Sequence, residues 1–162
     1  MIYLTVSPDA PLTQGDLLDG CRILRHTDGD EVDRISTRVI VLTQACDLAQ
    51  HKADWVVVAT VVAAEKVVGE GTLKASAVRD QVRLGRVFGW YYLPAAPEPI
   101  PVPESIVNLR DLHTVPRSLL EKLAADGKRP ARLNTPYREH LAQHFAVSYM
   151  RIALPEQFAT RG

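Results

Sequence analysis

The sequence predicts an α+β domain in which a curved antiparallel sheet is followed by two C-terminal helices. Three observations predict it: β-branched apolar runs in the first half, prolines at almost every second position of 94–103, and helical apolar spacing after residue 115. With 162 residues, 46% of them hydrophobic, the chain can bury one core without disulfide or metal staples. We therefore predict a single domain over residues 1–162, mainly β through 115 and helical over 116–150.

The predicted strands follow from runs of β-branched and aromatic residues. A strand at 22–25 leads into Thr27-Asp28-Gly29-Asp30, where Asp and Gly favour a turn. The runs at 38–43 and 55–64 are continuous rather than alternating, which predicts central strands covered on both faces. The remaining predicted strands are 87–93, 105–109 and 112–115.

Proline and glycine positions predict the other segments. The Pro-rich segment 94–103 is excluded from a central strand or helix, and we expect extended chain along an edge of the sheet. Pro116 fits the first turn of a helix through residue 125, with Gly127 as its stop. Thr135 and Pro136 begin a second helix that runs to about residue 149. A weaker helical pattern spans 72–84.

Composition excludes several classes of protein. The 19 basic and 19 acidic residues balance, which argues against a uniformly basic nucleic-acid binder. Two cysteines make no disulfide framework, and no apolar run is long enough to span a membrane. We expect a cytoplasmic protein without a membrane partner. The balance hides a gradient, because residues 1–34 carry seven acids and three bases whereas 110–151 carry eight bases and four acids.

The loop after the strand at 38–43 is the most distinctive local string. It contains the polar residues Thr43, Gln44, Cys46, Asp47 and His51. These residues allow a structural corner, a binding site, or a nucleophilic or metal site built on the cysteine. Asp47 opposes a thiolate at Cys46, and the loop has no paired CxxC spacing for tight zinc binding.

Two further groups of side chains are candidates for binding. The basic residues of the C-terminal third can contact nucleic-acid phosphates or an acidic partner: Lys128, Arg129, Arg132 and Arg138. His140 and His144 are spaced i, i+4 on one helix face, as in a helical metal pair, but lack the intervening glutamate of a zinc protease. Because the chain also lacks P-loop, GxGxxG, GxSxG and HExxH motifs, no cofactor is predicted.

Gln14-Gly15-Asp16-Leu17 and the apolar strand from Arg38 to Thr43 resemble the start of the MazF/PemK/Kid toxins over residues 14–65. The resemblance implies an SH3-like β-barrel and RNA cleavage, with Arg38 and Thr43 as candidate cleavage residues. Cys46-Asp47, the Pro-rich segment and the two C-terminal helices depart from that family. The Gly-Asp start and the Gln-x-Cys-Asp-Leu loop are also similar to small uncharacterised bacterial proteins.

Three functions remain open from the sequence. The absent catalytic motifs, the charge gradient and the Pro-rich segment favour a non-enzymatic interaction or regulatory module of a bacterial accessory system, docking on a protein partner. The first alternative is a MazF-like metal-independent endoribonuclease, which binds RNA. The second is a metal or cysteine-dependent site in the 43–51 loop. Each of these functions is compatible with a homodimer.

Overall fold

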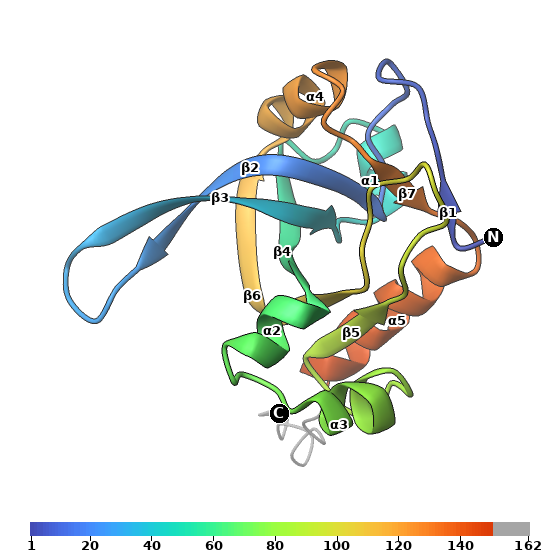
Figure 1. Cartoon of the computed structure of the whole chain (residues 1–162). Helices are drawn as coiled ribbons and strands as arrows, with labels where there is room; N and C mark the ends of the chain where they lie inside the picture. Colours follow the sequence, from blue (N-terminus) through green and yellow to red (C-terminus); the bar gives the residue numbers. More distant parts are fainter. Residues whose placement is uncertain (151–162) are drawn as a thin grey trace, which may run out of the picture.

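The computed structural model describes residues 1–150, so the end of the predicted domain, 151–162, lies outside the described residues. The strands are β1 (Tyr3–Leu4), β2 (Asp16–His26), β3 (Val32–Val41), β4 (Trp55–Ala63), β5 (Trp90–Leu93), β6 (Ser105–Pro116) and β7 (Ala131–Leu133). The helices are α1 (Ala45–Ala49), α2 (Ala64–Gly69), α3 (Ala75–Ala77), the π-helical turn η1 (Val78–Val82), α4 (Arg117–Ala125) and α5 (Tyr137–Tyr149). Figure 1 shows these elements in sequence colours.

All described strands belong to one antiparallel sheet, in the order β1-β7-β2-β3-β4-β6-β5. The α+β class is therefore confirmed. The sheet is open, because within residues 1–150 the outer strands β1 and β5 do not pair with each other. The closed barrel that the toxin resemblance implied is not formed in this part of the chain.

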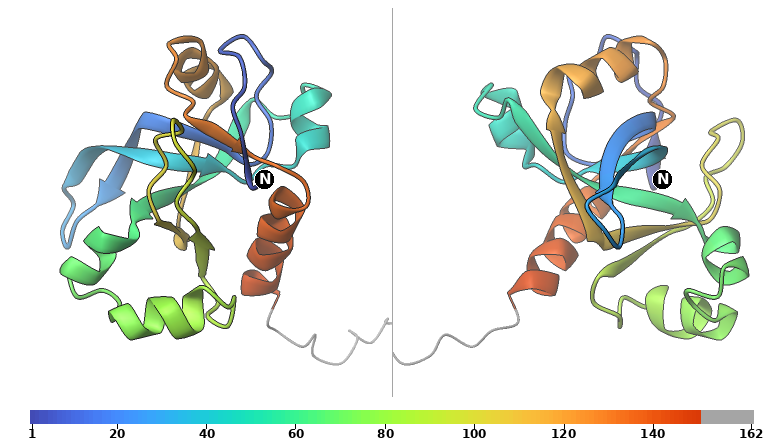
Figure 2. Two further views of the ribbon diagram at one scale, coloured as in Figure 1. Left: turned by 45° about the vertical axis from the view of Figure 1, so that its right-hand side comes forward. Right: turned by 90° about the vertical axis from the view of Figure 1, so that its left-hand side faces the viewer.

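The central strands are buried on both faces, as their continuous apolar runs predict. Neighbouring residues of β3 point to opposite sides: Ile40 packs in the cluster that contains Leu141 of α5, and Val39 in the cluster that contains Leu120 of α4. Both β3 residues are fully buried. The sheet is thus the middle layer, with α5 on one face and α4 and α1 on the other, as the views in Figures 1 and 2 agree. A third, smaller cluster joins α2 and η1 to Ile106 of β6.

Several element boundaries differ from the prediction. The strands expected at 105–109 and 112–115 form the single strand β6, which bulges where the register steps from Leu112 opposite Ala59 to Asn108 opposite Thr60. The helix expected over 72–84 is shorter, consisting of α3 and η1. The predicted helical region 116–150 also contains a strand, because β7 inserts between β1 and β2.

The Pro-rich segment connects β5 to β6. Instead of lying extended along an edge, it doubles back, because the Ala96 amide donates to the Val102 carbonyl at 2.8 Å. Val102 is buried in the α5-side core, and the Tyr3 hydroxyl donates to the Pro94 carbonyl at 2.6 Å. The segment is therefore part of the folded body.

Candidate interaction surface

The strands β2 and β3 continue beyond the sheet as a two-stranded hairpin over residues 22–36, which we call the arm. β7 pairs with β2 only at Asp16 and Leu17, and β4 pairs with β3 only from Arg38 onward. The two arm strands pair with each other along their length. Within residues 1–150, both outer edges of the arm therefore lack a neighbouring strand, and Figure 1 shows the outer part of the arm projecting from the body.

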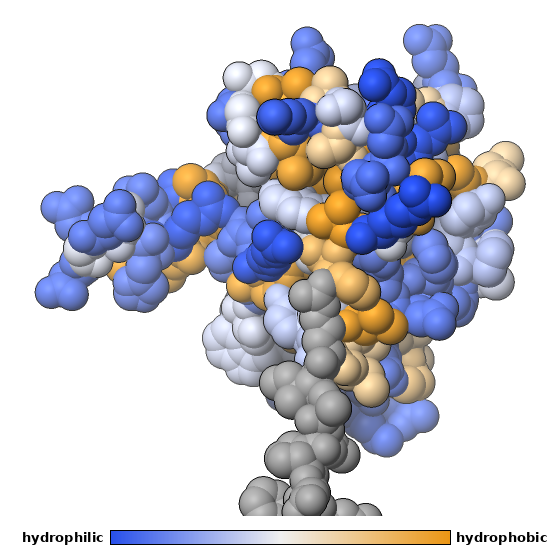
Figure 3. Space-filling view, turned by 90° about the horizontal axis from the view of Figure 1, so that it is seen from below, coloured by the Kyte–Doolittle hydropathy of each residue, from blue (hydrophilic) through white to orange (hydrophobic). Residues whose placement is uncertain are grey.

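The two faces of the arm differ because side chains alternate along a strand. Ile23 and Ile35 lie opposite each other and pack in the core on the α4 side. On the other face, Leu24 is 62% exposed and Val32 is 46% exposed. Figure 3 shows the arm from below as a largely hydrophilic projection with hydrophobic side chains among its charges. Exposed apolar side chains on an open β-ribbon are a feature of surfaces that bind another chain.

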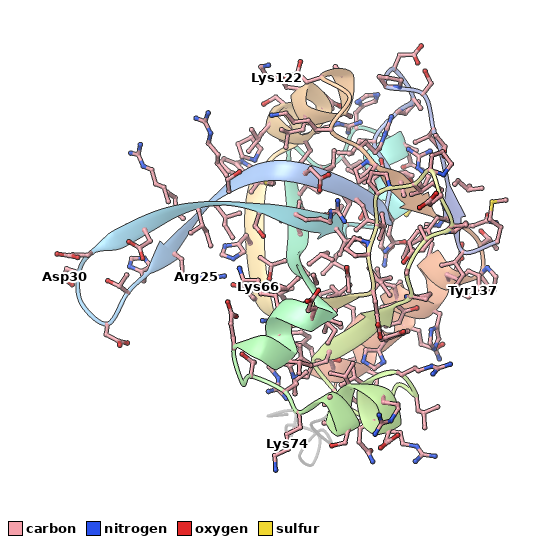
Figure 4. The ribbon with its side chains drawn as sticks, in the orientation of Figure 1. Arg25, Asp30, Lys66, Lys74, Lys122 and Tyr137 are labelled. Atoms are coloured by element: carbon pink, nitrogen blue, oxygen red, sulfur yellow. The ribbon has the colours of Figure 1, made fainter. Side chains whose placement is uncertain are left out.

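Charge is also unevenly distributed along the arm. The turn at its outer end carries three exposed acids, Asp28, Asp30 and Glu31, whereas Arg22 and Arg34 are exposed nearer the body. None of these five side chains forms an ion pair with another described residue. Figure 4 shows Asp30 at the outer end, far from Arg25. The arm therefore has an acidic turn at its outer end and two arginines nearer the body, with Leu24 opposite Arg34 and Val32 next to the turn.

The arm is attached to the body by a polar cluster around Asp111, which lies in the bulge of β6. Arg25 of the arm forms an ion pair with this carboxylate. The Thr60 hydroxyl donates to Oδ2 of Asp111 at 2.8 Å, and Nε2 of His113 lies 2.8 Å from Oδ1. Burial raises the pKa of the Asp111 carboxyl, but the hydrogen bonds from Thr60 and His113 and the charge of Arg25 outweigh it and hold the pKa below its usual value.

A polar cleft of about 450 Å³ opens beside Asp111. Its walls come from the arm, β4, α2, β5 and β6, and its lining includes Arg25, Thr60, Lys66, Trp90, Asn108 and Asp111. Both cations of the lining have acidic partners, because Lys66 lies 3.8 Å from Glu70 and Arg25 pairs with Asp111. The polar cleft is therefore nearly balanced in charge.

The acidic N-terminal region and the basic C-terminal region meet in a buried cluster of Asp16, Arg129 and Arg132, which we call the Asp16 cluster. The carboxylate of Asp16 accepts from Arg129 at 2.9 Å and from Arg132 at 2.5 Å. The side chains of Asp16 and Arg129 are 0% and 1% exposed. Arg129 also donates to the carbonyls of Ser7 and Ala10, which fixes the N-terminal loop. Part of the charge gradient is thus neutralised within the fold.

The loop at 43–51 contains the short helix α1. The Thr43 hydroxyl accepts from the Val57 amide at 2.8 Å, which ties the loop to β4. Cys46 is exposed, with its Sγ 3.6 Å from Oε1 of Gln44 and 3.9 Å from Oδ1 of Asp47. His51 is exposed and has positive φ. Gln44 and Cys46 line a cleft of about 480 Å³ together with residues of α5 that include Arg138, so the structure brings Arg138 near this loop.

The other candidate residues lie apart from that loop. Arg38 donates to Asp19 at 2.5 Å and to the Pro101 carbonyl at 2.9 Å, so its guanidinium joins β2 to the Pro-rich segment. Lys128 is exposed, whereas Arg129 and Arg132 belong to the Asp16 cluster. The four predicted basic residues therefore do not form one exposed basic patch.

The histidines of α5 lie at the border of its buried face, where His140 is exposed, His144 is half-buried and both contact Tyr91. Nδ1 of His140 lies 3.0 Å from the Tyr91 hydroxyl, and the His144 ring packs edge-on against Tyr91 at 5.5 Å. Burial lowers the pKa of His144. Among the described residues, no group of three or more His, Cys, Asp or Glu side chains is placed to hold a metal ion.

No protein-family model and no curated protein matches the chain. Within residues 1–150, none of the helices has the length and apolar character needed to cross a membrane. The sheet order and the unpaired edges of the arm define an α+β protein with an open antiparallel sheet and a projecting β-ribbon.

The sequence analysis missed the arm and the polar cleft as functional features. The turn at 27–30 and the strand before it were predicted, but the arm projects because β4 and β7 do not extend beside it. Asp111 falls in the gap between the two strands predicted at 105–109 and 112–115. That interruption in an otherwise continuous strand pattern is the available signal for the bulge.

Proposed function

We propose that the protein is a non-enzymatic interaction module that docks on another protein through the arm. The observation that carries this proposal is the pair of open strand edges of residues 22–36. Unpaired backbone amides and carbonyls on such edges accept an additional strand, and exposed side chains then select the partner. Leu24 and Val32 supply the apolar contacts for such a partner.

The attachment of the arm supports the same function. An isolated two-stranded hairpin is marginally stable in water, so a projecting hairpin gains order from whatever it contacts. Ile23, Ile35 and Arg25 attach the inner part of the arm, up to the Arg25–Asp33 pair, to the body. The outer part, around Asp30, has no core contact within the described residues. A partner bound along the outer part completes a surface that the body leaves uncovered.

Site-specific photo-crosslinking in the native host tests this function. A photoreactive phenylalanine analogue replaces Leu24 on the arm, and the matched control replaces Lys122 on α4, which is also well exposed but distant from the arm (Figure 4). We expect one protein adduct of defined mass from the Leu24 position and none from Lys122. Absence of an adduct at Leu24, or the same adducts at both positions, contradicts the proposal.

A second candidate function is metal-independent RNA cleavage beside the polar cleft, favoured by the contacts of Arg25 and His113 with the carboxylate of Asp111. Cleavage of RNA without metal needs a proton acceptor, a proton donor and a cation at the phosphate, and these three residue types can supply them. An SH3-like core and a relationship to the MazF/PemK/Kid toxins belong to this candidate. Arg38 and Thr43 are its sequence-predicted residues, but their polar atoms make structural contacts.

Incubation of the purified protein with RNA in the presence of a chelator tests the second candidate. We expect fragments if the cleft is catalytic, with loss of cleavage in His113→Ala and Asp111→Asn. Thr43→Ala and Arg38→Ala separate this cleft from the residues that the toxin resemblance implies. Intact RNA with the wild-type protein rejects the candidate.

A further inference from the structure

We infer that the arm binds a second copy of this chain, through its own arm in antiparallel orientation. This inference rests on the proposed docking function and names the partner, and the contact it describes is made by the exposed face of Leu24 and Val32 and not by the strand edges. A symmetric pair needs one surface that is complementary to itself, so that each copy supplies both halves of the contact. The order of side chains along the arm meets that requirement.

Charge is the first part of the argument. Arg22 and Arg34 lie on the same face as Leu24 and Val32, because paired and alternate residues share a face. Beyond them the turn is acidic. When two such faces meet antiparallel, the acidic turn of each arm lies against the arginines of the other. A parallel arrangement instead places the two acidic turns together, which costs free energy.

The apolar side chains are the second part. Along this face Arg22 lies nearest the body, Leu24 lies opposite Arg34, and Val32 lies opposite His26 next to the acidic turn. In the antiparallel pair these side chains therefore meet near the two-fold axis. Burial of apolar surface at the centre, surrounded by opposite charges, is the usual anatomy of a protein interface.

Net charge is the third part. The arm carries four acids and three bases, and the whole chain has no formal net charge. Two copies therefore approach without long-range repulsion, and the local charge order selects the antiparallel orientation.

Sedimentation velocity of the purified full chain gives the first test. We expect a concentration-dependent monomer–dimer equilibrium. The dimer dissociation constant should rise at least about tenfold between about 0.1 M and about 1 M salt, where the screening length falls from about 10 Å to about 3 Å. A monomer at every concentration in low salt overturns the inference.

Charge reversal gives the decisive test. A tip variant carries Asp28→Lys, Asp30→Lys and Glu31→Lys, and a base variant carries Arg22→Glu and Arg34→Glu. Each variant alone places like charges in contact and is expected to be monomeric, whereas an equimolar mixture should form a heterodimer. Lys74→Glu changes an exposed charge away from the arm and should leave dimerisation unchanged (Figure 4). Circular dichroism and the unfolding midpoint verify that each variant is folded.

A mixture that stays monomeric, or variants that dimerise like the wild type, overturns the inference. Failure of the inference is distinguishable from failure of the docking function. If the purified chain is monomeric but the crosslinker at Leu24 captures a different protein, the docking function stands and self-association falls. If the same position captures nothing, the docking function itself falls.

Discussion

The Asp16 cluster and the arm use charged residues in opposite ways. In the Asp16 cluster, one buried carboxylate is paired with two arginines from the other end of the chain. In the arm, acids and arginines are exposed and no ion pair within the described residues joins the tip to the base. The first arrangement stabilises the fold, whereas the second leaves its charges available to another molecule.

This difference changes the meaning of the zero net charge. The excess acid of the N-terminal region is partly paired with the basic C-terminal region inside the protein. Most of the other acidic residues of this region lie in the arm. There, the positions of the acidic and basic residues along the hairpin matter more for binding than the net charge of the arm. The following predictions test how sharply the two regions differ.

The largest effect is expected from Arg129→Met, which removes one partner from the Asp16 cluster. The free energy of unfolding should fall by about 3–5 kcal/mol, because the buried carboxylate loses a cation and the carbonyls of the N-terminal loop lose their donor. Denaturant titration measures this change. A loss below about 1 kcal/mol would show that the cluster contributes no more than a surface ion pair.

The labelling rates of the two cysteines test whether the body stays closed next to the arm. Cys21 lies directly before the arm and is fully buried, and its burial raises the pKa of its thiol to about 11. Cys46 is exposed. We expect a thiol reagent to label Cys46 at least about 100-fold faster than Cys21 in the native protein. Cys46→Ser and Cys21→Ser variants assign each rate, and comparable rates would mean that the opening of the arm extends into the body.

Asp111 joins the two regions, so its substitution has an intermediate effect. Asp111→Asn should lower the free energy of unfolding by about 1–2 kcal/mol at neutral pH, because charge-assisted bonds to Arg25 and His113 weaken. The folded protein depresses the pKa of this carboxyl, so its contribution is present above the ordinary pKa and is lost as pH falls below about 4. Unfolding curves of both proteins should therefore converge in acid, and a constant difference down to pH 2 contradicts this explanation.

The smallest effect on stability is expected in the arm. Arg34→Ala and Asp30→Ala should each change the free energy of unfolding by less than about 0.5 kcal/mol at protein concentrations where the chain is monomeric. The same variants should weaken dimerisation. A destabilisation near that of Arg129→Met would mean that these charges support the fold, and the contrast between the two regions would disappear.

Elements that depend on local backbone chemistry were predictable from the sequence. Pro116 and Gly127 bound α4, and Pro136 precedes α5, because proline fixes φ at a helix start and Gly127 has φ of +74°. The buried central strands were also predictable, since an uninterrupted apolar run needs cover on both faces. For these elements, the residues nearby in the sequence are sufficient to predict the structure.

Elements that depend on distant partners were not predictable. β7 has only three residues, and it is a strand because Ala131 and Arg132 pair with β2 and Leu133 with Tyr3. Arg129 and Asp16 are 113 positions apart, so no local pattern assigns one to the other. The arm likewise depends on where β4 and β7 stop. One sequence cannot specify these endpoints without the tertiary arrangement.

The position of β7 between β1 and β2 has a consequence for synthesis on the ribosome. Among the strands of residues 1–150, β1 pairs only with β7, so β1 has no strand to pair with until residue 133 has been made. At translation rates of about 5–20 residues per second, this delay after the arm has been made is roughly 5–20 s. β1 is thus made before the arm but pairs long after it, and β1 stays accessible to chaperones and proteases throughout that interval.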